Sequence, residues 1–351
     1  MKQRPGRVHL AIVLAWLYAC PLFSVQIKSE GRKNQRIVFL SDRGKSKRQF
    51  DLYTMDLGDL KAVNLTGDRR DVSLRSNSLP KLNRERNSVL FISFNPRNLV
   101  EMDLTTRAVR TVAELRYEAT DYCIAPDGRS VVYTEKTDST LQLFGIDLRR
   151  GVKRNLSNNR FNNFEASFSS DGSKVVYVCD QDGSNSIAIM NADGSGQRML
   201  TNPFGDDRYP KFSPDDRQIV FSSSRSGLTD SDYGLYTIDI TGSPFALFYQ
   251  SKTFNTQPQF SPDRAYVAFV SNARGPLTRD IFLKDLKTGA VEPITSELTY
   301  LSGNINITDD GQCIVFENIG PSDSEIWMYQ RKTRQLRNIT KHPGRDISPS
   351  L

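Results

Sequence analysis

Catalytic chemistry has few candidate side chains in this 351-residue sequence. Only two histidines occur, His9 and His342, so a Ser-His-Asp arrangement within the folded part would have to use His342. No G-x-S-x-G segment is present to hold a nucleophilic serine on a strand-to-helix turn. The same shortage of histidine disfavours a histidine-held metal centre. We therefore assign no catalytic, metal-binding or cofactor-binding residue.

The other chemistry-bearing residues are carboxylates and cysteines. Forty Asp and Glu side chains leave a paired-carboxylate enzyme open, because two of them can converge in a channel. The segment DQDG at 180–183 resembles part of a calcium loop, but its terminal glutamate ligand is missing, so we interpret it as a hairpin turn. No C-x-x-C spacing occurs, and we expect Cys123, Cys179 and Cys313 to be small buried residues.

Three arginines follow similar short segments, which are SDRG at 41–44, SSRSG at 223–227 and SNARG at 271–275. If these segments are structural repeats, Arg43, Arg225 and Arg274 lie on the same face of the molecule. Arginines are frequent anchors of protein interfaces, so we predict that the three form a docking rim for an acidic partner. The alternative is that they are solvent-exposed turn residues encoded by the repeat.

An internal repeat determines the elements that position these residues. An apolar triplet ending in an aromatic residue occurs seven times, at 37–39, 89–91, 131–133, 175–177, 219–221, 267–269 and 314–316. The aromatic residues are 42 to 52 positions apart, close to the ~40 to 45 residues of a four-stranded propeller blade. Helical repeats of this length do not fit, because the units consist of short β-branched and aromatic runs separated by Asp-Gly and Pro-Asp turns.

The fifth unit shows the strands most clearly, at 209–213, 218–224, 234–240 and 245–250. The turn between the first two strands carries an aspartate in five of the units. A carboxylate in such a turn accepts backbone N–H bonds, which is the role we assign to Asp127, Asp171, Asp215, Asp263 and Asp310.

The two ends of the repeat array complement each other. The first triplet has no recognisable strand before it, whereas the last unit runs on into GRDISPSL at 344–351. This tail copies DDRYPKF at 206–212, with Asp346 on Asp207 and Pro349 on Pro210. Pairing the C-terminal strand with the N-terminal blade removes two exposed sheet edges. We predict an all-β fold, a closed seven-bladed β-propeller over 37–351, with six blades as the alternative.

The repeats resemble those of a known family. IMNADGSGQRMLT at 189–201, together with FSPDD, FSSDG and IAPDG, is similar to the repeats of TolB-type, WD-repeat-like β-propellers. TolB itself has an N-terminal α/β domain before a six-bladed propeller, and neither feature is predicted from this sequence. The resemblance implies a protein-interaction role and does not identify the partner.

The N-terminus has the composition of an export signal. A positively charged start precedes an apolar stretch, so we assign 1–27 as a signal peptide or membrane anchor and 28–36 as a basic linker. Three fates remain open for this segment. They are cleavage as an ordinary signal, lipid attachment at Cys20 in the lipobox-like LYAC, and retention as an anchor that associates with the membrane.

Charge is concentrated near this signal. Residues 1–50 hold 11 Lys and Arg against two Asp and Glu, while the whole chain has a net charge of +7. The propeller itself is therefore close to neutral, which argues against a nucleic-acid partner.

Two functional interpretations follow. The first is a non-catalytic, monomeric scaffold of the bacterial cell envelope that binds a protein partner, and that is exported to the periplasm or anchored facing the periplasm or exterior. Loops on a rigid closed propeller are suited to such binding. The second is a hydrolase or lyase that acts on carbohydrate or peptide in the central channel, which would require converging carboxylates.

Overall fold

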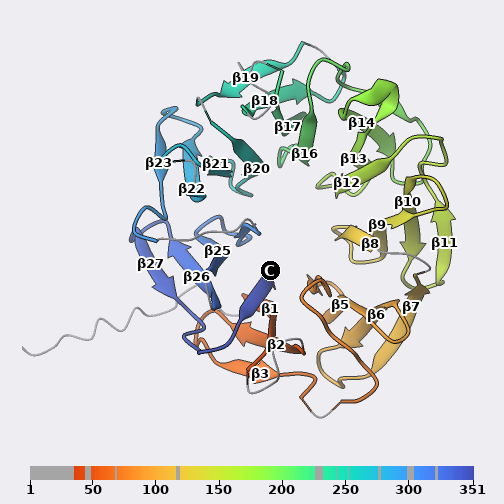
Figure 1. Cartoon of the computed structure of the whole chain (residues 1–351), viewed down its shortest axis with the longest axis vertical. Coiled ribbons are helices and arrows are strands. Elements are labelled where there is room, and N and C mark those ends of the chain that lie inside the picture. The colour runs from red at the N-terminus through yellow and green to blue at the C-terminus, as the bar shows by residue number, and fades with distance from the viewer. Residues whose placement is uncertain are drawn as a thin grey trace, which may run out of the picture. The chain divides into compact units, whose positions relative to one another are not determined.

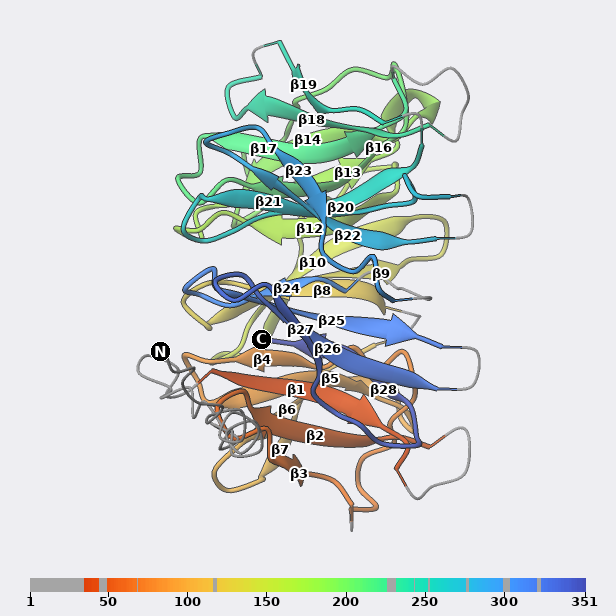
Figure 2. The same cartoon turned by 90° about the vertical axis from the view of Figure 1, so that its left-hand side faces the viewer.

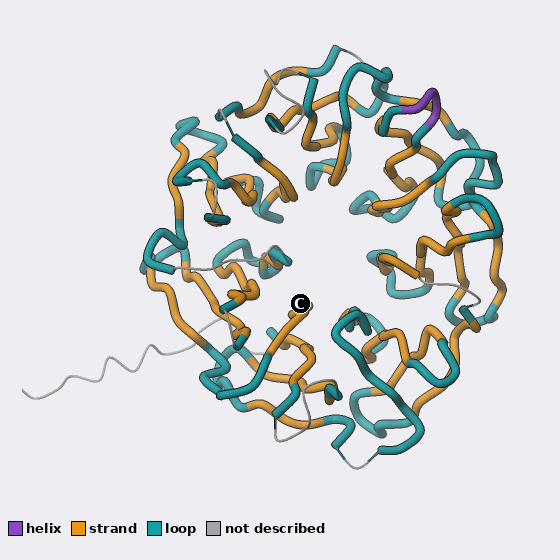
Figure 3. Tube along the Cα trace, viewed as in Figure 1, coloured by secondary structure: helices purple, strands orange, loops and turns teal. Residues whose placement is uncertain are grey.

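The structure is a computed structural model. It describes residues 35–351 apart from 44–48, 68, 116–118, 226–231, 243, 252, 276–277, 299–303 and 321–322. The described residues form seven four-stranded antiparallel sheets and one short 3-10 helix, η1 (Gln181–Gly183). Figure 1 shows the sheets as blades around a common centre, and Figure 3 shows the same ring built from strands and loops. Within the described residues, no helix has the length and apolarity needed to span a bilayer.

Each blade contains four strands, which we letter A to D from the centre of the ring outwards. Blade 1 consists of β28 (Asp346–Ser350), β1 (Arg36–Ser41), β2 (Asp51–Asp56) and β3 (Ala62–Asn64), and blade 2 consists of β4 (Lys81–Asn83), β5 (Ser88–Ser93), β6 (Asn98–Asp103) and β7 (Val109–Glu114). Blade 3 consists of β8 (Ala119–Ile124), β9 (Ser130–Lys136), β10 (Leu141–Asp147) and β11 (Val152–Asn155). Blade 4 consists of β12 (Asn163–Phe168), β13 (Lys174–Cys179), β14 (Ser186–Asn191) and β15 (Arg198–Met199). Blade 5 consists of β16 (Asp207–Phe212), β17 (Gln218–Ser223), β18 (Gly234–Asp239) and β19 (Ala246–Tyr249). Blade 6 consists of β20 (Asn255–Phe260), β21 (Tyr266–Ser271), β22 (Asp280–Asp285) and β23 (Val291–Pro293). Blade 7 consists of β24 (Asn306–Ile307), β25 (Cys313–Ile319), β26 (Ser324–Gln330) and β27 (Gln335–Asn338).

The C-terminal strand closes the ring. Strand β28 pairs with β1 in an antiparallel register that places Asp346 opposite Ser41. The A and B strands of blade 5 have the same register, with Asp207 opposite Ser223. The predicted closure is therefore confirmed, as is the count of seven blades, and the six-bladed alternative is excluded.

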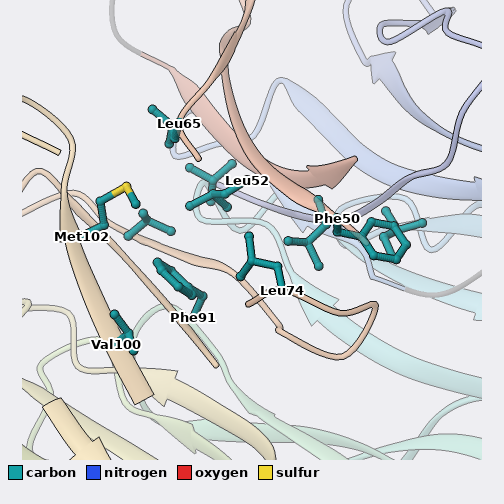
Figure 4. Close-up of a cluster of buried hydrophobic side chains, with 11 residues drawn as sticks. Phe50, Leu52, Leu65, Leu74, Phe91, Val100 and Met102 are labelled. Atoms are coloured by element: carbon teal, nitrogen blue, oxygen red, sulfur yellow. The ribbon is translucent and has the colours of Figure 1, made fainter. Parts of the chain in front are cut away.

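The core lies between neighbouring blades. Successive side chains of a strand point to opposite faces, so the B-strand triplet contributes to two interfaces. In blade 1, Ile37 and Phe39 pack against blade 7, whereas Val38 packs against blade 2, and all three are fully buried. Figure 4 shows seven labelled members of the cluster between blades 1 and 2, which are Phe50, Leu52, Leu65, Leu74, Phe91, Val100 and Met102. Burial on both faces explains why the B strands have continuous apolar sequences instead of alternating ones.

Aspartate organises the turns between strands A and B. In each of the five predicted turns, the carboxylate Oδ1 accepts the backbone N–H two residues later, at 2.8 to 3.4 Å. The prediction for Asp127, Asp171, Asp215, Asp263 and Asp310 is therefore confirmed. These carboxylates are engaged in local structure.

A second repeated contact holds the outer strands. In five blades, a Ser or Thr hydroxyl just after strand D accepts the backbone N–H of a strand C residue 14 positions earlier, at 2.8 to 3.1 Å. The five hydroxyl groups belong to Thr66, Ser157, Thr201, Thr295 and Thr340. This contact gives a physical reason for the recurring polar segment after strand D.

The direction of the strands divides the propeller into two faces, which are seen from the side in Figure 2. The A–B and C–D connections share one end of every blade, and we call this end the turn face. The B–C connections and the D–A links between blades share the opposite end, which we call the loop face. Loop-face connections such as 42–50 and 272–279 are longer than turn-face connections such as 261–265.

Replacement of Thr201 with valine tests the hydroxyl contact. Thr201 is buried, and its Oγ1 accepts the Ile187 N–H at 2.8 Å. Thr201→Val leaves that N–H without a partner, so we expect the free energy of unfolding to fall by about 1 to 3 kcal/mol in urea titrations. The matched control is Thr111→Val on the exposed outer strand β7, which should change stability by less than about 0.5 kcal/mol. Equal losses in the two variants would contradict the assignment.

Candidate functional site

The innermost strands carry a recurrent irregularity. Within the described residues, six of the seven A strands contain, or begin two positions after, a non-glycine residue in the left-handed region, with φ between 47° and 65°. These residues are Leu79, Glu165, Tyr209, Gln257, Asn304 and Ser348. The register of the A–B pairing shifts around this position in blades 1, 4, 5 and 6, as expected for a β-bulge, and a similar shift occurs in blade 3 between Ala119 and Tyr122. Four of the six residues precede a proline, which supplies no N–H to the ladder.

The A strands contribute one equivalent residue each to a ring around the channel, and in the six blades with a left-handed residue it lies two positions after that residue. Every member pairs with the middle residue of its B-strand triplet and is half-buried. We call this set the channel ring, and from blade 1 to blade 7 it consists of Ser350, Lys81, Cys123, Ser167, Lys211, Gln259 and Asn306. Five members are uncharged, and the two lysines belong to blades 2 and 5.

A cavity of about 560 Å³ lies between the A strands of blades 2 to 5. Three members of the channel ring line it, namely Lys81, Cys123 and Lys211. Further lining residues are Asp121, Tyr122, Phe164, Glu165, Arg208 and Tyr209. Four successive blades therefore contribute charged or aromatic groups to one concave site, which is the usual character of a binding site.

One cation and one anion in the cavity neutralise each other. Arg208 Nε donates to Glu165 Oε1 at 3.1 Å, and the backbone N–H of Tyr209 donates to Glu165 Oε2 at 2.7 Å. Both oxygens of Glu165 are thus engaged by neighbouring groups. This carboxylate is held as an ion-pair partner, a poor state for a general acid.

The two lysines have weaker contacts. Among the described residues, Lys81 Nζ has a cation–π contact with Tyr122, at 5.5 Å from the ring centroid, and no hydrogen bond. Lys211 Nζ donates to Ser167 Oγ at 3.5 Å, the long limit for a hydrogen bond. Burial, together with the positive charge of Lys211, lowers the pKa of Lys81, while Asp121 acts in the opposite direction. The two ammonium groups line the same cavity, and like charges that share a cavity disfavour each other.

Cys123 lies in the same cavity but is not activated. Burial raises the pKa of its thiol to about 11, against a smaller opposing effect of Lys211 and Lys81. A thiol with this pKa is protonated at neutral pH and is a poor nucleophile. Cys179 and Cys313 are buried as expected, whereas the expectation is wrong for Cys123, which is half-buried because it lines the cavity; all three are free cysteines.

The three arginines predicted to form a docking rim occupy related positions after their B strands, and each is paired with a buried aspartate. Arg43 Nη2 lies 2.9 Å from Asp346 Oδ2. Arg274 Nε lies 2.6 Å from Asp280 Oδ2, and Arg225 Nη2 binds Asp207. Arg43 and Arg225 also stack on the aromatic pairs of their own blades.

These pairs give the arginines a structural role that the sequence did not reveal. The exposed fractions of the Arg43, Arg225 and Arg274 side chains are 17%, 5% and 35%. Arg274 is therefore the most accessible of the three to a partner. Contact between the rim and an acidic partner stays a prediction.

Other candidate positions have local roles or fall outside the described residues. Asp180 of the DQDG segment accepts the backbone N–H of Asn162 at 2.7 Å, and His342 Nδ1 accepts the N–H of Gly344 at 3.2 Å. Among the described residues, no three His, Cys, Asp or Glu side chains come together as metal ligands. Cys20 and the assigned signal segment lie outside the part of the chain that the structure describes.

The fold and its channel define the class of protein as a closed seven-bladed β-propeller. Residues 28–198 match the family described as the TolB beta propeller domain, which confirms the TolB-type resemblance seen in the repeats. TolB from Acinetobacter baumannii has a similar structure, with a TM-score of 0.59 and 18% identity, over 87% of this chain and 80% of that chain.

Proteins with enzymatic names share parts of this architecture. An oligogalacturonate lyase in complex with manganese has a TM-score of 0.62 and 16% identity, over 87% of this chain and 85% of that chain. Dipeptidyl-peptidase 5 of Porphyromonas gingivalis is 27% identical over 148 residues, which are 39% of this chain. The match spans 22% of the length of that relative. Structural likeness at these identities establishes the fold and leaves the activity open.

Removal of the Arg225 side chain tests its structural role. Asp207 is fully buried, so we expect Arg225→Met to lower the free energy of unfolding by about 3 to 5 kcal/mol. Burial already raises the pKa of Asp207, and loss of Arg225 raises it further. Because protonation then relieves the unpaired charge, the deficit should be smaller at pH 5 than at pH 8.

The matched control is Arg264→Met. Arg264 pairs with Asp215 in the same way, but its side chain is 56% exposed, so we expect a loss of at most about 1 kcal/mol. Adding Asp207→Asn to the Arg225 variant should restore part of its stability and remove the pH dependence. Chemical denaturation at both pH values measures each effect. A stable, pH-independent Arg225→Met protein would contradict the role.

Proposed function

We propose that the protein is a non-catalytic, TolB-like scaffold of the bacterial cell envelope that binds a protein partner. The observation that carries this proposal is the channel cavity, which gathers side chains from four blades yet holds groups suited to binding more than to catalysis. Its thiol is protonated at neutral pH, and Glu165 is tied to Arg208 and to the Tyr209 N–H. The two lysines remain available for a ligand.

The difference between the two faces supports a role in binding. The turn face is built from short aspartate turns whose carboxylates bond to their own backbone. The loop face carries the longer connections, and the most exposed large apolar residue of the described chain, Phe204, lies there at 74% exposure. Longer connections on a rigid frame are the common place for recognition. We therefore place the partner on the loop face, where Arg274 belongs to the predicted rim.

A hydrolase or lyase acting on carbohydrate or peptide is the second candidate. The enzymatic names among the structural relatives favour it. Within the cavity, Asp121 would have to act with Glu165, but Glu165 would first have to leave its ion pair with Arg208. This requirement makes the binding function the better supported of the two.

Export is part of the proposal. The segment 1–27 would direct the chain to the periplasm, with Cys20 as the candidate site of lipid attachment and the basic linker 28–36 beside the membrane. Mass spectrometry of the mature N-terminus separates the three fates, because cleavage, acylation of Cys20 and retention give different masses.

Site-specific photo-crosslinking tests the scaffold function. The full chain, expressed in its native bacterial envelope, carries p-benzoylphenylalanine either at Phe204 on the loop face or, as the control, at exposed Lys61 on the turn face. We expect one protein to be crosslinked through Phe204 and to be absent from the Lys61 sample, with identification by mass spectrometry. Crosslinking that does not depend on the position would overturn the proposal. So would turnover of peptides or oligosaccharides by the purified full chain without any specific crosslink.

A further inference from the structure

The channel ring departs from neutrality at two positions. Five of its seven members are Ser, Cys, Gln or Asn, whereas Lys81 and Lys211 each bring a positive charge. Three blade steps separate blade 2 from blade 5 in a ring of seven, so the two lysines extend from opposing walls. Both line the same cavity of about 560 Å³.

The counter-charges in the cavity do not balance these lysines. Glu165 is neutralised by Arg208, which leaves Asp121 as the other lining carboxylate. Two ammonium groups against one carboxylate leave a net positive charge.

Burial makes this imbalance costly. A partly buried cation is stabilised by an anion within a few ångströms, and two neighbouring cations destabilise each other. Lys81 has no hydrogen bond among the described residues, and both its burial and the charge of Lys211 lower its pKa. A bound anion would relieve both effects.

We infer that the channel cavity between blades 2 and 5 binds an acidic peptide segment of the protein partner, with Lys81 and Lys211 each contacting a carboxylate. This inference rests on the proposed scaffold function and names the part of the partner that the channel recognises. Tyr122, Tyr209 and Phe164 supply apolar wall for the rest of the segment.

Carboxylates suit this site better than phosphate does. Phosphate sites in proteins commonly use helix N-termini, nests of backbone N–H groups or the bidentate fork of arginine. Here the walls are β-strands, and the fork of Arg208 is occupied by Glu165. Two separate ammonium point charges match two separate carboxylates along an extended peptide.

The test is fluorescence polarisation with the full chain and two labelled peptides of equal length, Gly-Asp-Glu-Asp-Glu-Gly and its uncharged counterpart Gly-Asn-Gln-Asn-Gln-Gly. We expect the acidic peptide to bind at least tenfold more tightly than the neutral one, and its affinity to fall as salt rises. The double variant Lys81→Gln with Lys211→Gln should lose at least tenfold in affinity for the acidic peptide.

The matched control removes the same total charge elsewhere. Lys61→Gln with Lys332→Gln changes two exposed lysines of the turn face and should leave the affinity within twofold. Thermal unfolding monitors the folding of both double variants. Since the channel lysines line a cavity, their replacement should preserve the fold. A second variant pair, Lys81→Met with Lys211→Met, repeats the test without the hydrogen-bonding amide.

The outcomes separate this inference from the function on which it rests. Equal binding of the two peptides, or unchanged affinity in both channel variants, would overturn the acidic-segment inference. If the Phe204 crosslink survives in those variants, the scaffold function stands without it. Binding of free succinate, with no binding of the acidic peptide, would show a small dicarboxylate as the occupant and would also overturn the inference. Cleavage of the acidic peptide would overturn the scaffold function itself.

Discussion

Backbone pairing between β28 and β1 is the constraint on which the rest of the structure depends. Every inter-blade interface buries apolar residues on both sides, so an incomplete blade 1 would expose two of them. The pairing brings the two ends of the repeat array into one sheet, and Arg43 reinforces it by binding Asp346 across that junction. Closure also fixes the positions of all A strands around one channel. The channel ring therefore exists because the ring of blades is closed.

The repeat imposes the same local chemistry on blade after blade. Aspartates satisfy the A–B turns, hydroxyl groups satisfy strand C, and arginines neutralise buried aspartates in blades 1, 5 and 6. These contacts give a structural explanation for the residues that recur from blade to blade, so those residues carry no information about a ligand. Function must then lie where equivalent positions differ. Lys81 and Lys211 are such positions, because the fold accepts Ser, Cys, Gln or Asn at the same point of the other blades.

Sequence patterns predicted the architecture well, because the relevant signals are local and the apolar triplet is repeated seven times. The triplets, the aspartate turns and the tail that copies residues 206–212 specify strands, turns and closure. The channel ring was not predicted, because its members share no residue type and are related only through A–B register. That register is shifted by bulges, and at Glu165 the left-handed φ has no distinctive sequence signal. At four other blades the available signal is an X-Pro step, at Leu79, Tyr209, Gln257 and Ser348.

The arginines after strand B show why a repeated charge is a weak guide to a binding surface. In the sequence, recurrence favours a rim, but each of these arginines also neutralises a buried aspartate, and that structural need accounts for the recurrence. Asp346 and Asp207 are fully buried, and Asp280 nearly so, and a charge at such depth needs a partner from its own chain. The lysines of the channel have the opposite character, since they are charged and half-buried and yet do not follow the repeat. A charged residue at a position where other blades have an uncharged one is the stronger indication of a ligand. Among the described residues, no contact within its own blade explains the free-energy cost of partly burying that charge.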